Sequence, residues 1–289
     1  MSVPIREAHA QSLAGVLIWL PTMVWLKPGW SPALLAFGPL VLYPLLLDML
    51  GECSLRRLAL PAFLPALASY ALEQGTIAGA LALPWLAFAI VLFLRNATTR
   101  TISINVVITG YLIVGAGWLV LARLGERPLE YEHAIVHATA VHFHYAGFVL
   151  PILALNWLHA APSRFRYVVL TALLLGVPLV AAGITLSAFQ IHWPELIAVW
   201  FFAAACIVFA VAQIRLAAHW LLVISSASLI AAMCLALVYG TRNYLPADWL
   251  DIPLMLRTHG PIQVFGFALP GALAWAMMNE KAKTSAAEN

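Results

Sequence analysis

Four histidines lie close together in one apolar stretch of this sequence. His133, His137, His142 and His144 fall within the run HAIVHATAVHFHYAGFVLP, which begins at His133 and ends at Pro151. Imidazole side chains bind transition metals, ligate haem iron and carry protons near neutral pH. Ionisable side chains are costly inside a bilayer, so a cluster of them within a membrane span indicates a functional site.

Helical geometry divides these histidines between two faces. At about 100° per residue, His133, His137 and His144 share one stripe. The four-residue spacing of His133 and His137 allows both imidazoles to bind one metal ion if other spans complete its shell. His142 and His144 diverge by about 160–200° in a regular helix, so they could address ligands on two sides. The alternative is that each histidine bonds to a neighbouring helix and only specifies packing.

A second polar cluster, RTHGPIQ, begins at Arg257. His259 is expected at a depth comparable with the histidine stripe, and Gln263 lies one turn deeper on the same face. Arg257 either extends to the interface or holds an anionic group. Glu73 and Glu195 lie at the ends of two other spans and are candidate metal ligands or proton carriers. The Pro-Glu pair that ends at Glu195 also suits the first turn of a helix, where the dipole favours an acid.

The composition predicts the elements that must position these residues. The chain has 289 residues, of which 63% are hydrophobic and 9% charged, whereas a soluble domain has about 25% charged residues. Apolar runs of about 20 residues recur, so we expect an all-α polytopic transmembrane helical bundle. Residues 1–289 should form a single integral membrane domain, with a short cytoplasmic tail at about residues 280–289. The ten expected spans are His9–Leu26, Pro32–Leu50, Leu58–Leu72, Thr76–Leu94, Ile102–Leu121, His133–Leu158, Tyr167–Ser187, Pro194–Gln213, Ala217–Tyr239 and Ile252–Met278.

The distribution of basic residues predicts the orientation of these spans. Ten of the 15 Lys and Arg residues lie at the N-terminus or in loops that follow even-numbered spans. Cytoplasmic loops carry such an excess of Lys and Arg, so both termini should be cytoplasmic. The histidine stripe and His259 then fall in the outer half of the bilayer. The basic residues are scattered through short loops, which does not indicate a nucleic-acid partner.

Several motifs resemble those of the YndJ-like family of bacterial membrane proteins. They are LLAFGPLVLYPLLLDML, ALPWLAF, HATAVHFHYAGFVLP and MLRTHGPIQVFGFALPG, and they occur in the order found in the family, over roughly residues 30 to 275. The resemblance implies a polytopic architecture in the inner membrane. It singles out five residues but implies no reaction: His137, His142, His144, His259 and Gly260.

A second resemblance concerns the histidine-bearing helices of the haem–copper oxidase and NnrS groups. HFHY is similar to a helix whose two histidines, one residue apart, ligate haems on opposite sides, and THGPIQVFGFALP is similar to another haem-ligating helix. The two motifs occur here in the reverse order. The copper-centre motifs of the oxidases, His-His and His-x-x-x-Tyr, do not occur in this sequence. The resemblance implies haem as a cofactor, without oxidase chemistry.

The leading hypothesis is an inner-membrane protein whose buried histidine site binds a metal ion or haem for a redox or metal-handling role. Its expected ligands are His133, His137, His142, His144 and His259, with support from Gln263, Arg257, Glu73, Glu195 and Tyr145. One alternative is a proton-coupled small-molecule transporter that uses the same histidines. Another is a non-catalytic structural subunit that contacts other membrane subunits. The sequence does not decide whether the protein is an enzyme.

Overall fold

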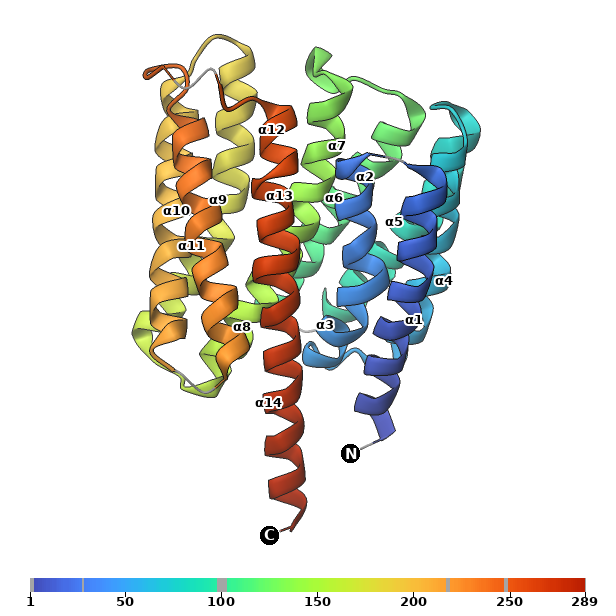
Figure 1. The fold of residues 1–289 in the computed structure, drawn as a ribbon, viewed down its shortest axis with the longest axis vertical. Coiled ribbons are helices and arrows are strands. Elements are labelled where there is room, and N and C mark those ends of the chain that lie inside the picture. Colours follow the sequence, from blue (N-terminus) through green and yellow to red (C-terminus); the bar gives the residue numbers. More distant parts are fainter. Residues whose placement is uncertain (1–2, 28, 98–102, 217–218, 247–248, 289) are drawn as a thin grey trace. The chain divides into compact units, whose positions relative to one another are not determined.

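The computed structural model describes residues 3–27, 29–97, 103–216, 219–246 and 249–288, and every regular element in these ranges is a helix (Figure 1). Nine runs of helix within these ranges are long and apolar enough to cross a membrane. This confirms the predicted all-α class and a multi-pass membrane protein. The last run continues to Ser285, so the expected cytoplasmic tail begins as a continuation of that helix.

The chain packs into two compact units, Met1–Ile152 with Ala276–Asn289, and Leu153–Trp275. The helices of the first unit are α1 (Val3–Leu26), α2 (Trp30–Phe37), η1 (Gly38–Leu42), α3 (Tyr43–Met49), α4 (Cys53–Ala68), η2 (Ser69–Ala71), α5 (Thr76–Ala97), α6 (Ile104–Leu124), η3 (Pro128–Glu130), α7 (His133–His142) and η4 (Phe143–Val149). Those of the second unit are α9 (Arg164–Ala188), α10 (Trp193–Ile214), α11 (Trp220–Gly240), α12 (Ile252–Arg257), α13 (His259–Pro261) and η5 (Ile262–Ala268). Two helices, α8 (Leu150–Ala160) and α14 (Leu269–Glu288), have residues in both units.

Large apolar side chains point outward from both units. Leu17 on α1 is 65% exposed, Ile77 on α5 is 72% exposed and Val168 on α9 is 61% exposed. Water would penalise so much exposed apolar surface, whereas lipid chains accept it. These outward faces are therefore the surfaces that contact the lipid bilayer.

The third expected span, Leu58–Leu72, differs from the prediction. Its helix, α4, begins earlier, at Cys53, and ends at Ala68, after which η2 adds one tight turn. Just beyond the end of α4, Arg123 at the end of α6 donates hydrogen bonds to the carbonyls of Ser69 and Leu72. Although α4 has only 16 residues, it connects the two ends of the first unit: its start lies against α1 and α3, and η2 lies against the end of α6.

Three segments of π-helix occur in the described residues, and each ends two residues before a proline. They are η1 before Pro44, η4 before Pro151 and η5 before Pro270. A proline has no N–H, and its ring clashes with the carbonyl four residues earlier, which lies inside the π-helical segment in all three cases. The wider π turn accommodates that carbonyl without breaking the helix. The regular helical angles expected for the histidine run therefore do not extend beyond His142.

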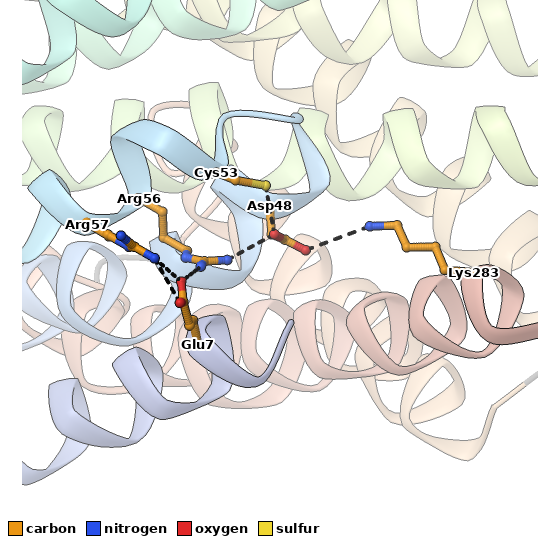
Figure 2. A network of polar contacts seen from close by, with 6 residues as sticks. All are labelled: Glu7, Asp48, Cys53, Arg56, Arg57 and Lys283. Atoms are coloured by element: carbon orange, nitrogen blue, oxygen red, sulfur yellow. Dashed lines mark hydrogen bonds and ion pairs between the residues drawn. The ribbon is translucent and has the colours of Figure 1, made fainter. Parts of the chain in front are cut away.

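A network of charged residues joins three helices of the first unit (Figure 2). The Arg56 guanidinium on α4 donates to Glu7 on α1 at 2.8 Å and to Asp48 on α3 at 3.0 Å. Its side chain is only 1% exposed. Arg57 also binds Glu7, at 2.8 Å, but its side chain is 68% exposed. Burial, and then the hydrogen bond that Cys53 donates to Asp48, raises the pKa of the Cys53 thiol.

The same network connects the two ends of the described chain. The Nζ of Lys283 on α14 lies 4.0 Å from the second carboxylate oxygen of Asp48 (Figure 2). The start of α1 and the end of α14 thus lie at the same end of the first unit. This agrees with the prediction that both termini face one side of the membrane.

Replacing Arg56 with alanine should destabilise the protein much more than replacing its neighbour. Arg56→Ala leaves two carboxylates without their buried partner, which costs about 3 kcal/mol. Arg57→Ala removes an exposed pair and should cost less than about 1 kcal/mol. The measurement is the free energy of unfolding of each variant in detergent micelles. Equal losses for the two variants would contradict the central position of Arg56 in this network.

Candidate functional site

His137 lies at the centre of a hydrogen-bonded chain in the first unit. Its Nδ1 is 2.7 Å from the hydroxyl oxygen of Ser31 at the start of α2. Its Nε2 is hydrogen-bonded to the hydroxyl of Tyr70 in η2. These partners are 106 and 67 residues away in the sequence, and the turn of chain between α4 and α5 brings Tyr70 to α7. Both ring nitrogens of His137 are thus bonded to hydroxyl groups, which can either donate or accept.

Arg123 lies on the other side of Tyr70. Its guanidinium carbon is 4.7 Å from the centre of the Tyr70 ring. Its Nε donates to the Ser69 hydroxyl at 3.0 Å, and its Nη2 donates to the Ser69 and Leu72 carbonyls at 2.8 and 2.9 Å. Arg123 is 6% exposed. A buried cation therefore lies next to the Ser31–His137–Tyr70 chain.

His144, two turns further along the same helix, is in a different environment. It is fully buried, and its Nδ1 donates to the Ala140 carbonyl at 2.7 Å, because a carbonyl can only accept. Its Nε2 accepts from the indole N–H of Trp85 at 2.9 Å. This assigns one neutral tautomer in which both nitrogens are used. A metal ion on this imidazole would have to displace the Trp85 indole.

The other predicted residues of this helix are spread over different environments. Tyr145 is buried, and its hydroxyl donates to the Leu34 carbonyl on α2 at 2.7 Å. His133 is exposed at the first residue of α7. His142 is half-buried and packs edge-on against Phe143, 6.0 Å between ring centres. Of the four histidines, the structure places His137 and His144 toward the interior partners described above.

The second predicted cluster belongs to the second unit. The Nδ1 of His259 donates to the Ala232 carbonyl on α11 at 2.9 Å. This fixes the tautomer in which the Nε2 atom carries the lone pair. Gln263 is half-buried in η5, and Arg257 is exposed at the end of α12.

The two acidic candidates, Glu73 and Glu195, differ in burial and in their partners. Glu73 is exposed in the connection between η2 and α5. Glu195 is 2% exposed in the first turn of α10 and forms an ion pair with Arg242, with oxygen–nitrogen distances of 2.7 and 3.2 Å. The position in the first turn agrees with the helix-terminal interpretation of Glu195. The pairing with Arg242 neutralises its charge within the second unit.

In the described part of the chain, no three His, Cys, Asp or Glu residues come together as a set of metal ligands. What the structure brings together is His137 with three residues that sequence reasoning missed: Ser31, Tyr70 and Arg123. The only feature of the sequence that pointed to these three residues was their position within or beside a predicted membrane span. Trp85, the partner of His144, does lie within the motif ALPWLAF.

Two glycines of α6 provide a test of how closely this helix approaches His144. A Cβ atom on Gly115 would lie 2.7 Å from the Nδ1 of His144 and 3.1 Å from the Cβ of Phe143, whereas a Cβ atom on Gly117 would meet nothing within 4 Å. Gly115→Ala should therefore destabilise the protein by about 1–3 kcal/mol. Gly117→Ala should be neutral or stabilising by up to about 1 kcal/mol, because alanine favours the helix. Thermal unfolding in detergent measures both, and tolerance of alanine at Gly115 would refute this close packing.

Comparison with known proteins identifies the family of this chain. The family model of the YndJ-like proteins matches residues 33–267. The uncharacterised membrane protein YndJ of Bacillus subtilis (strain 168) is 29% identical over 178 residues. That match covers 59% of this chain and 32% of the relative, so the chain spans about a third of the relative's length. No solved structure matches the chain. The family match extends over most of the sequence and confirms the resemblance seen in the motifs: the chain belongs to the YndJ-like family of membrane proteins.

Proposed function

We propose that this membrane protein passes protons along the Ser31–His137–Tyr70 chain and couples that step to the movement of a small solute. The observation that carries the proposal is the pair of hydroxyl partners on His137. Each tautomer of the ring can make both hydrogen bonds, since a hydroxyl donates to an unprotonated nitrogen and accepts from a protonated one. A ring with two equivalent tautomers is suited to proton transfer.

The transfer is balanced at every atom. The Ser31 hydroxyl gives its proton to Nδ1 of His137 while Nε2 gives its proton to the Tyr70 oxygen. Tyr70 releases its own hydroxyl proton to water, and Ser31 takes a replacement proton from water at the other end of the chain. One proton has then crossed the chain, and the ring is left in its other tautomer. Rotation of the two hydroxyls and return of the ring tautomer prepare the next transfer.

The charged and titratable groups around His137 favour a neutral imidazole that transfers a proton over an imidazolium that keeps one. Tyr70 on η2 bonds directly to His137, and Arg123 on α6 lies over the Tyr70 ring. The positive charge of Arg123 opposes a lasting imidazolium at His137. His144 holds a fixed neutral tautomer and so adds no acidic partner. An imidazole in this setting transfers protons through tautomers without holding a second one.

Proton flux into proteoliposomes should depend on both ends of the chain. With a pH gradient and a pH-sensitive dye, the protein should dissipate the gradient faster than empty liposomes do. His137→Ala and Tyr70→Phe should each slow this flux at least about tenfold, because a positioned proton-transfer group contributes that much or more. His133→Ala, an exposed histidine on the same helix, is the matched control and should leave the flux unchanged.

The proposal fails if the wild-type protein adds no flux to that of empty liposomes. It also fails if His137→Ala slows the flux no more than His133→Ala does. Variants that lower the unfolding temperature while the flux stays intact would assign the histidine a packing role only.

A second candidate function, metal or haem binding, is favoured by one observation in the second unit. The Nδ1–H of His259 is held by the Ala232 carbonyl. Ligand histidines usually donate their second N–H in this way, which orients the ring and leaves Nε2 to bind the metal. His259 would be the ligand, and haem or a transition metal ion at this position would supply redox chemistry.

An absorption spectrum with elemental analysis of the purified protein tests this candidate. A haem protein should show a Soret band that His259→Ala removes, with His159→Ala, at an exposed histidine of the second unit, as the control that keeps the band. A colourless, metal-free preparation would eliminate both the haem and the metal hypotheses. The result is independent of the flux measurement, because His259 and His137 belong to different units.

A further inference from the structure

Arg123 carries a buried positive charge for which the described residues offer no carboxylate. Its partners are one hydroxyl, two carbonyls and an aromatic face, from Ser69, Leu72 and Tyr70. The described ion pairs do not include this arginine, whereas Arg56 and Arg242 each bind carboxylates of acidic side chains. Buried charges are ordinarily paired because the cost of removing them from water is large.

The carbonyls offset only part of this charge. Ser69 begins the single turn of η2 that follows α4, and Leu72 comes directly after that turn. The carbonyl dipoles at such a helix end carry a partial negative charge equivalent to about half an elementary charge. The Tyr70 ring face adds a weaker attraction. A net positive charge therefore remains beside the Ser31–His137–Tyr70 chain.

One terminal nitrogen of this guanidinium is not used by the protein. The three hydrogen bonds involve Nε and Nη2 only. Nη1 donates to no described residue, and it is not among the fully enclosed polar atoms that lack a partner. Its two N–H groups can therefore reach a ligand. Glu73 is exposed in the adjacent connection and forms no ion pair with Arg123.

We propose that Arg123 binds a small monovalent anion, such as a carboxylate, through Nη1, beside the proton chain. A single negative charge matches the single unpaired cation, whereas a divalent anion would leave excess negative charge in a buried position. One free nitrogen suits a single oxygen atom of the anion, because the two-oxygen fork that carboxylates and phosphates often make with arginine would need Nη2 or Nε as well. The inference names the solute class of the proposed transport and in that respect rests on the proposed function.

Binding can be measured on the whole protein in detergent with radiolabelled acetate as the probe. Equilibrium dialysis at constant sodium concentration should show saturable binding of acetate to the wild-type protein. Arg123→Gln removes the charge and should abolish that binding. Arg123→Lys keeps a charge for the Ser69 and Leu72 carbonyls but has no Nη1, so it should fold and bind acetate at least about tenfold more weakly.

Arg257→Gln is the matched control, because Arg257 is an exposed arginine that the sequence also offered as an anion site. It should bind acetate as the wild-type protein does. The inference is overturned if the wild-type protein binds no more acetate than empty micelles do. It is also overturned if Arg123→Lys binds acetate as tightly as the wild type, or if Arg257→Gln abolishes the binding.

Tyr70→Phe separates this inference from the proposed function. The variant keeps the aromatic ring over Arg123 but removes the hydroxyl of the proton chain, so it should bind acetate and lose proton flux. Acetate binding by a wild-type protein without proton flux would overturn the proposed function and leave the anion site standing. Proton flux by a wild-type protein that binds no acetate would overturn the anion site and leave the proposed function standing.

Discussion

Polar groups within the hydrocarbon of a bilayer must find their hydrogen-bond partners inside the protein, because no water is available to replace them. Much of the first unit follows from this constraint. The Trp85 indole is satisfied by His144, the Tyr145 hydroxyl by a carbonyl of α2, and the end of η2 by Arg123. Each of these bonds joins elements that are far apart in the sequence, so the pairs that satisfy buried polar groups also fix which helices are neighbours.

Small residues make these pairings geometrically feasible. The backbone of α6 passes so close to His144 that only glycine fits at Gly115, and Gly147 on η4 meets Tyr111 in the same way. Membrane helices commonly pack through such small residues, since lipid supplies little hydrophobic force between helices. The close approach holds the imidazole of His144 against Trp85. Both ring nitrogens of this buried histidine are thus used within the protein.

The class of the protein and most of its spans could be predicted from the sequence because length and hydropathy alone determine them. Helical spacing put His133, His137 and His144 on one stripe, but in the structure His133 is exposed, and a π-helix replaces the regular angles after His142. The partners of His137 and His144 did not follow from the sequence: Ser31, Tyr70 and Trp85 are contributed by other helices, and a periodic pattern contains no information on which helices touch. Arg123 gives no signal in the sequence beyond its place just after a predicted span, since its burial depends on the position of η2 in the fold. The π-helical segments do not follow from the prolines alone, since Pro84 and Pro178 lie inside regular α-helices.

Two of the three prolines that follow a π segment are preceded by the same sequence pattern. Gly-Phe-x-Leu-Pro occurs at Gly147–Pro151 and again at Gly266–Pro270, and in both places a seven-residue π segment ends two residues before the proline. A π segment changes the rotation of the helix about its axis without ending the helix. The face that points inward before the segment is therefore set independently of the face that points inward after it. In the continuous helix α7–η4–α8, the part before η4 can then direct His137 toward Ser31 and Tyr70. The part after Pro151 can pack through a different side of the helix. In this family, a change in the length of such a segment would alter which residues face inward without changing the number of membrane crossings.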